Sequence, residues 1–87
     1  METRPFRNLS HRLRGYDFYE LRAGVIHRRY SLFREDLLHV SEIESWAIYP
    51  EMVFDVIEIR RRGNRPLIWL DYRNDLRAIL ETLHAGR

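Results

Sequence analysis

The densest group of chemically active side chains is a set of arginines on both sides of a glycine. Arg60, Arg62 and Arg65 flank Gly63-Asn64, and Trp69 follows. Gly-Asn between two alternating apolar segments predicts a two-residue hairpin turn, which places Arg62 opposite Arg65 with Arg60 on the same face. Guanidinium groups gathered in this way can hold a phosphate or a carboxylate, and an indole can stack a ring beside them. Solvent, salt and a nearby carboxylate can also offset the repulsion, so a purely structural role stays open.

Thiol and metal chemistry find little support in the sequence. The 87 residues include no cysteine, which excludes disulfides, thiolate metal ligands and thiol nucleophiles. The histidines are spread along the chain without a ligand motif: His11, His27, His39 and His84. We therefore expect no metal and no cofactor.

Catalysis by carboxylates or a phosphate-binding loop is not indicated either. Two pairs of carboxylates lie close in sequence, Glu42 with Glu44 and Asp71 with Asp75. Acid–base catalysis needs a pocket and perturbed pKa values, and nothing in the sequence around these pairs predicts them. The four glycines of the chain form no nucleotide-binding motif. We therefore expect a protein that is not an enzyme.

The charge balance argues against a dedicated nucleic-acid-binding domain. All 15 basic residues are arginines, but 13 acidic residues reduce the formal net charge to +2. Aromatic side chains that could stack RNA bases occur at Tyr16, Phe18, Tyr19, Tyr30 and Phe33. In the expected hairpin they fall on both faces, which is more typical of a core and a surface than of an RNA-binding platform.

Length and hydropathy predict one soluble domain. A domain of this size buries only about 60% of its unfolded surface, so association with a partner would help to stabilise it. No apolar segment approaches the about 20 residues of a membrane span, and we expect a cytoplasmic protein without a transmembrane segment. Residues 1–15 are polar and basic, and predict a leader or a short helix with Pro5 in its first turn and Gly15 at its end. Residues 16–87 form the domain.

A β-hairpin is predicted for residues 16–33, with its turn around Ala23-Gly24. Alanine disfavours positive φ, so we expect a type I turn at Arg22-Ala23 with Gly24 left-handed instead of a two-residue turn. The pairs in this register are Leu21 with Val25, Tyr19 with His27 and Asp17 with Arg29.

A charged turn and an interrupted strand are predicted next. Residues 34–36 (Arg-Glu-Asp) form the turn. Residues 37–49 have the β-branched and aromatic content of extended chain, interrupted at Ser41-Glu42. A helix over residues 37–46 is the alternative, because apolar side chains recur there at a spacing of three: Val40, Ile43 and Trp46.

The last third of the chain has the clearest pattern. A turn at Pro50 precedes the longest predicted strand, residues 53–61, which pairs with residues 66–72 through the Gly63-Asn64 turn. One face of this hairpin is a core surface: Ile57, Ile59, Ile68, Leu70 and Tyr72. Asn74 is a suitable N-cap for a final helix. The apolar stripe of that helix is Leu76, Ile79, Leu80 and Leu83.

Three stretches share the layout of a known family: YELRAGVIHRR (19–29), LLHVSEIESW (37–46) and FDVIEIRRRGNRPLIWLDYRNDLRAILETL (54–83). The chain resembles the bacterial pleckstrin-homology-like domains. The resemblance implies an α+β fold, an antiparallel meander or split barrel of five to six strands capped by one C-terminal helix. It also implies a non-catalytic interaction module that is oligomeric through its sheet edges. The family has seven strands, and its phosphoinositide-binding pattern of basic residues is not met at residues 27–30, so lipid binding does not carry over.

Two functions are therefore expected. The first is a non-enzymatic binding or assembly module, with a protein partner or a second copy of the chain at a sheet edge. The alternative is an RNA- or anionic-lipid-binding protein that takes its acidic ligand at the hairpin tip. The candidate binding residues for an anion or a partner are Arg60, Arg62, Arg65 and Trp69.

Overall fold

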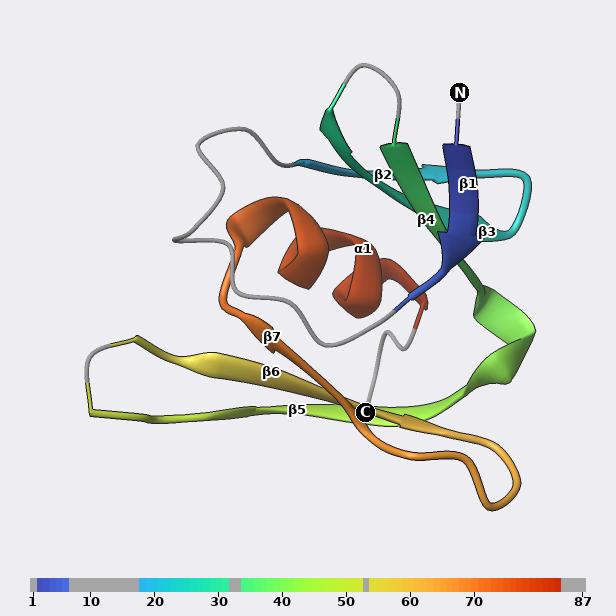
Figure 1. The fold of residues 1–87 in the computed structure, drawn as a ribbon. Helices are drawn as coiled ribbons and strands as arrows, with labels where there is room; N and C mark the ends of the chain where they lie inside the picture. The colour runs from blue at the N-terminus through green and yellow to red at the C-terminus, as the bar shows by residue number, and fades with distance from the viewer. Residues whose placement is uncertain (1, 7–17, 32–33, 53, 84–87) are drawn as a thin grey trace.

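The structure of the protein is a computed structural model, which describes residues 2–6, 18–31, 34–52 and 54–83. Within these ranges the chain forms seven strands in two sheets, one α-helix and one short 3-10 helix. Figure 1 shows the α-helix between the two sheets, so each sheet has an inner face toward this helix and an outer face away from it. The predicted α+β class with a C-terminal helix is confirmed, whereas the described strands form two separate sheets and no closed barrel.

Four strands make the first sheet and three make the second. The first has the order β1 (Glu2–Pro5), β4 (Arg34–His39), β3 (Val25–Ser31) and β2 (Phe18–Arg22). The second has the order β5 (Ile43–Tyr49), β6 (Val56–Arg61) and β7 (Ile68–Asp71). A short 3-10 helix, η2 (Val40–Glu42), joins the sheets, and α1 (Asn74–Leu83) follows β7. β1 runs parallel to β4, and the other neighbouring strands are antiparallel.

The β2–β3 hairpin forms where the sequence predicts it, but the predicted register is wrong by one residue. Ala23 and Gly24 both have positive φ, +50° and +75°, so they form the two-residue loop that was expected to exclude alanine. A left-handed alanine costs about 1 kcal/mol, which the paired strands on both sides can offset. The shift places Ile26 on the inner face and Phe18 on the outer face. The observed pairs are Arg22 with Val25, Leu21 with Ile26, Glu20 with His27, Tyr19 with Arg28 and Phe18 with Arg29.

The charged turn predicted at residues 34–36 is also wrong, because these residues begin β4. Arg28 faces Asp36 across the β3–β4 ladder, and Arg29 faces Glu35. Three consecutive charged residues are typical of a turn when they are solvated. Here partners of opposite charge on β3 allow the carboxylates to enter the sheet.

Residues 37–46 are extended on both sides of a single helical turn. Their predicted interruption at Ser41-Glu42 is η2, and the chain resumes as β5 at Ile43. The prediction of extended chain in this segment is therefore confirmed, and the alternative prediction of a helix is wrong. The apolar spacing of three arises because the chain changes from one sheet to the other at η2.

Glu2–Pro5 form strand β1, which corrects the prediction of a helix with Pro5 in its first turn. β1 lies at the edge of its sheet, where a proline that donates no hydrogen bond is tolerated. The next residue, Phe6, is buried and donates its backbone N–H to the carbonyl oxygen of Leu37 at 3.2 Å. The domain boundary predicted at residue 15 lies outside the described residues.

The β6–β7 hairpin has the predicted register but a wider turn than predicted. Gly63 has a φ of +78° and Asn64 does not have a positive φ, which is the combination a type II′ turn requires. The pairing of β6 with β7 nevertheless ends at Ile59 and Ile68, and residues 62–67 lie outside the strands. β6 begins only at Val56, so it is shorter than β3 and β5 and is not the longest strand. The observed pairs are Ile59 with Ile68, Glu58 with Trp69, Ile57 with Leu70 and Val56 with Asp71.

The core lies between the inner faces of the two sheets and α1. The predicted core surface of the second hairpin is confirmed, since its four aliphatic side chains are at most 2% exposed and Tyr72 packs against them. The predicted C-terminal helix is present as α1 and buries Leu76 and Leu80, but Asn74 is its first residue and not its N-cap. The carboxylate of Asp75 accepts the backbone N–H of Tyr19 at 3.0 Å, which attaches the start of the helix to strand β2.

The inner face of the first sheet contains a buried ion pair. Arg28 and Asp36 form it, and their side chains are 0% and 1% exposed. The guanidinium carbon of Arg28 lies 4.7 Å from the centroid of the Phe6 ring, which in turn lies 6.1 Å from the Tyr19 ring. Breaking such a pair leaves an uncompensated buried charge, so the pair favours the register in which these two residues meet.

Candidate functional site

Large apolar side chains are exposed at one end of the second sheet. Tyr49, in the last position of β5, is 50% exposed, and Trp69, on the outer face of β7, is 54% exposed. Phe54 and Met52, in the connection between β5 and β6, are 45% and 101% exposed. Exposed aromatic side chains that gather in one place mark an interaction surface more often than scattered ones do.

A groove lies among these side chains. Its volume is about 310 Å³, and its lining residues are Tyr49, Pro50, Glu51, Val56, Glu58 and Trp69. The indole Nε1 of Trp69 donates a hydrogen bond to the Glu58 carboxylate at 2.9 Å, which orients the ring. Aromatic walls with two carboxylates suit a cationic side chain that has an apolar stem. We call this group the acidic aromatic groove.

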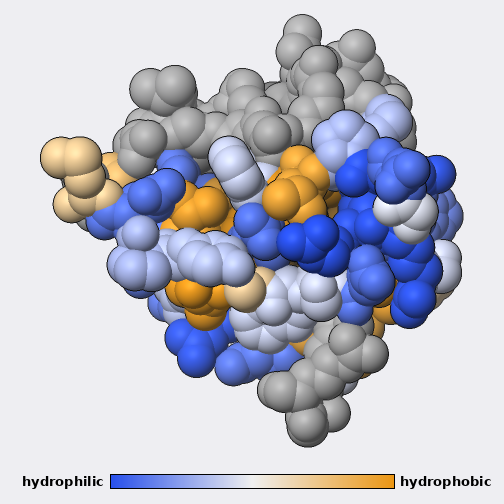
Figure 2. All heavy atoms as spheres, turned by 90° about the horizontal axis from the view of Figure 1, so that it is seen from below, coloured by the Kyte–Doolittle hydropathy of each residue, from blue (hydrophilic) through white to orange (hydrophobic). Residues whose placement is uncertain are grey.

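The opposite end of the same face is basic. Arg60 follows Glu58 by two residues on β6, so both side chains point to the outer face. The side chain of Arg60 is exposed and has no hydrogen bond or ion pair with another residue of the described ranges. Figure 2 views the molecule from the side of the second sheet, and shows hydrophobic and pale spheres toward one side and the most hydrophilic spheres toward the other.

The structure places Arg62 and Arg65 beside η2, away from Trp69. The side chain of Arg62 donates to the carbonyl oxygen of Ser41 at 3.0 Å, and Arg65 forms an ion pair with Glu42 at 2.6 Å. The four candidate residues from the sequence therefore do not line one pocket. Arg60 and Trp69 lie on the outer sheet face, and Arg62 and Arg65 brace the loop against η2. We call residues 62–65 the arginine loop.

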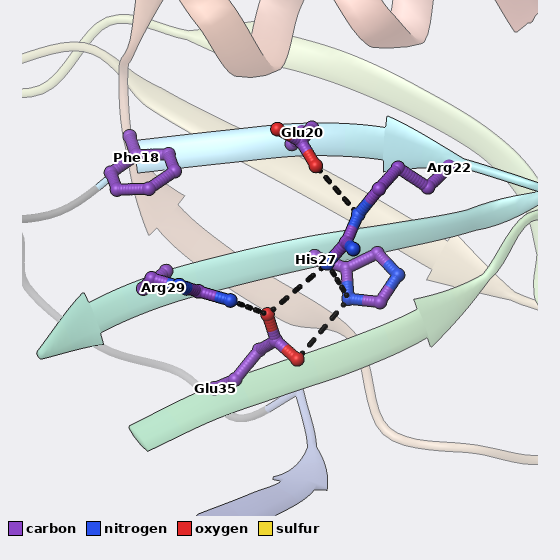
Figure 3. Close-up of a pocket in the computed structure, with 6 residues that line it drawn as sticks. All are labelled: Phe18, Glu20, Arg22, His27, Arg29 and Glu35. Atoms are coloured by element: carbon purple, nitrogen blue, oxygen red, sulfur yellow. Dashed lines mark hydrogen bonds and ion pairs between the residues drawn. The ribbon is translucent and has the colours of Figure 1, made fainter. Parts of the chain in front are cut away.

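A second hollow lies on the outer face of the first sheet. Its volume is about 250 Å³, and its lining residues are Phe18, Glu20, Arg22, His27, Arg29 and Glu35. Figure 3 shows the carboxylate of Glu35 between basic side chains, at 3.0 Å from Arg29, 3.3 Å from His27 and 3.4 Å from Arg22. Arg22 also lies 2.5 Å from Glu20. The charged groups of this hollow thus bind one another.

Burial and pairing act in opposite directions on Glu35. Desolvation raises the pKa of its carboxyl group, but hydrogen bonds and charge interactions with Arg29 and His27 outweigh burial and hold the pKa below the ordinary value of 4.5. Glu35 is therefore ionised at neutral pH. A carboxylate with a low pKa and three basic neighbours is poorly suited to exchange protons with a substrate.

In the part of the chain that the structure describes, no three His, Asp or Glu side chains come together as a group that could hold a metal ion. None of the helices in this part of the chain combines the length and the apolar character needed to cross a membrane.

Several residues at these sites could not be assigned from the sequence. Trp69 was among the predicted binding residues, but Tyr49 and Glu51 were not, because the sequence of residues 50–55 does not show how β5 is aligned with β6. The first-sheet hollow was missed for another reason. A register error of one residue places Glu20 and His27 on different faces, whereas they pair directly.

Comparisons of the chain with protein families, with curated proteins and with solved structures find no match. A function therefore has to be argued from the geometry of the chain itself.

Proposed function

We propose that this chain is a non-enzymatic protein-binding module whose binding surface is the outer face of the second sheet. The observation that carries the proposal is the half-exposed pair Tyr49 and Trp69 beside a groove on that face. Tryptophan, tyrosine and arginine are the residues that contribute most at protein interfaces. All three types are present on this face, with Arg60 at its far end.

Two of the sheet edges, those of β2 and β7, support binding less well than this face does. The edge strand β2 is occupied in part, because its Tyr19 N–H is bonded to Asp75 of α1 at 3.0 Å. The edge strand β7 has only four residues, Ile68–Asp71, and short edge strands are poor templates for pairing. The proposal therefore moves the interaction from the edges, where the resemblance places it, to the face.

An anion-binding role for the arginine loop is the weaker alternative. Arg62 and Arg65 already bond to Ser41 and Glu42, and Arg61 donates to the carbonyl oxygen of Pro66 at 2.9 Å. An RNA or lipid phosphate would have to compete with these bonds. Nothing in the loop resembles an anion site prepared for its ligand.

Affinity capture with the immobilised chain tests the proposal. Lysate of the source cells would be passed over wild type, Trp69→Ala and the control Arg77→Ala, which changes an exposed residue of α1. We expect proteins that wild type and Arg77→Ala retain and that Trp69→Ala loses, as measured by mass spectrometry. The proposal is wrong if Trp69→Ala changes neither the retained proteins nor the self-association of the chain.

We also propose that the fold is a variant of the pleckstrin-homology-like split barrel. Support comes from the meander of β2 to β7 over two sheets, with α1 after the last strand. The parallel pairing of β1 with β4 departs from an all-antiparallel meander. An experimental structure superposed on members of that family would test the assignment.

A further inference from the structure

The outer face of the second sheet is complementary to itself. We infer that its partner is a second copy of this chain, packed face to face with the two β6 strands antiparallel about a two-fold axis. This inference rests on the proposed function, because it names the partner that the same face binds. In such an interface every contact occurs twice, so one favourable pair of residues contributes two interactions.

The order of charges along β6 carries the inference. Val56, Glu58 and Arg60 all point outward, and alternate residues of a strand lie about 6.6 Å apart. A two-fold axis that lies in the interface, perpendicular to β6, and passes between Glu58 and Arg60 brings each Arg60 onto the Glu58 of the other copy. Arg60 lacks a partner within the described ranges of its own chain, and this contact supplies one.

The strands on either side of β6, which are β5 and β7, are compatible with the same two-fold axis. Glu58 pairs with Ala47 on β5, and Arg60 pairs with Ser45, so small side chains would meet over the middle of β5. Small residues allow two sheets to approach to the usual spacing of about 10 Å. On the other side of β6, Trp69 of one copy would lie near the start of β7 of the other, because Trp69 pairs with Glu58.

The two ends of the outer face of the second sheet are also complementary in charge. The axis that places Arg60 on Glu58 also brings the acidic aromatic groove of one copy toward the arginine loop of the other. Glu51 and Glu58 line the groove, whereas Arg60, Arg61, Arg62 and Arg65 lie at or in the loop. A guanidinium group beside Trp69 and a carboxylate gains both a cation–π contact and an ion pair.

A basic peptide from another protein would explain only half of the face. It could fill the acidic aromatic groove, but it would leave the side chain of Arg60 without an acidic partner. A second copy supplies acidic groups to the basic end and basic groups to the acidic end at the same time. Complementary charges of this kind also fix the register in which two surfaces meet.

Sedimentation equilibrium of the full chain tests the inference with charge exchange. We expect wild type to form a reversible dimer, of twice the 10.7 kDa chain mass. Arg60→Glu and Glu58→Arg should each weaken the dimer about tenfold or more, because each places like charges together at both symmetry-related contacts. An equimolar mixture of these two variants should dimerise again, since the mixed dimer has one native pair and one exchanged pair. Arg77→Glu on α1 is the control with the same change of charge, and it should leave the dimer unchanged.

Each outcome separates the inference from the proposed function. Recovery in the mixture supports the two-fold contact and shows that both variants fold. Wild type that stays monomeric up to about 1 mM overturns the inference. So do single variants that dimerise like wild type, or a mixture that fails to recover. If the chain is monomeric and still retains another protein through Trp69, this inference fails while the proposed function stands.

Discussion

The two sheets of this protein place their charges in opposite ways. The first sheet buries the Arg28–Asp36 pair on its inner face, and on its outer face Glu35 binds the neighbouring basic side chains. The second sheet has an aliphatic inner face, and on its outer face it exposes Trp69 and Arg60. Charges that are satisfied within the chain stabilise the fold and leave little for a partner to bind. The most highly charged hollow of the described residues is therefore one whose charged groups are already paired with one another.

The largest effect should come from the inner face of the first sheet. Asp36→Ala would leave the guanidinium of Arg28 buried without its carboxylate, and should lower the free energy of unfolding by about 3 to 5 kcal/mol. Urea denaturation followed by tryptophan fluorescence measures it. The double variant Arg28→Met with Asp36→Leu replaces both charges with apolar groups, and should recover most of the loss. A cost below about 1 kcal/mol for Asp36→Ala would contradict the importance of this pair.

Trp69→Ala should separate binding from stability on the second sheet. The indole is 54% exposed, so its removal should change the free energy of unfolding by about 0.5 kcal/mol or less. Binding through the outer face should weaken about tenfold or more, because an aromatic side chain at the centre of an interface contributes much of its affinity. Urea denaturation and sedimentation equilibrium on the same preparation give both values. A large loss of stability with unchanged binding would reverse the comparison between the two sheets.

Glu35→Gln should show the reverse of Trp69→Ala. It should lower the stability of the fold and leave binding through the outer face of the second sheet unchanged. The pKa of Glu35 is lowered in the folded state, so its ionised form stabilises the fold above the unfolded-state pKa, ordinarily 4.5. At pH 7 the variant should be less stable than wild type by about 1 to 2 kcal/mol. The difference should shrink as the pH falls below 4.5 and vanish below the folded-state pKa. Urea titrations at several pH values test this, and a difference that does not depend on pH would contradict it.

The smallest effects should come from the two turns. Ala23 has a φ of +50°, so Ala23→Gly should raise the free energy of unfolding by about 0.5 to 1 kcal/mol. Gly63 has a φ of +78°, and Gly63→Ala should lower it by a similar amount, although no atom crowds the position of the new Cβ. Thermal unfolding of the two variants compares them. Equal shifts of the same sign would contradict the role of left-handed backbone in both turns.

Patterns within a single hairpin or helix could be read from the sequence alone. The register of β6 with β7 and the four buried aliphatic residues on its inner face follow from alternation around Gly63. α1 begins at Asn74 and turns its predicted stripe inward. These features depend on neighbours in the sequence, and local periodicity records them.

The positions of the charged side chains in the fold depend on tertiary structure and do not follow from the local sequence. Three consecutive charged residues at 34–36 are typical of a solvated turn, and only the partners on β3 draw Asp36 into the core. The two-residue loop at Ala23-Gly24 is disfavoured locally and forms because the paired strands outweigh its strain. The arginines were visible in the sequence as one cluster. In the fold, Arg62 and Arg65 bond to η2, whereas Arg60 lies on the outer sheet face. The position of each arginine depends on the bonding partners that distant parts of the chain supply.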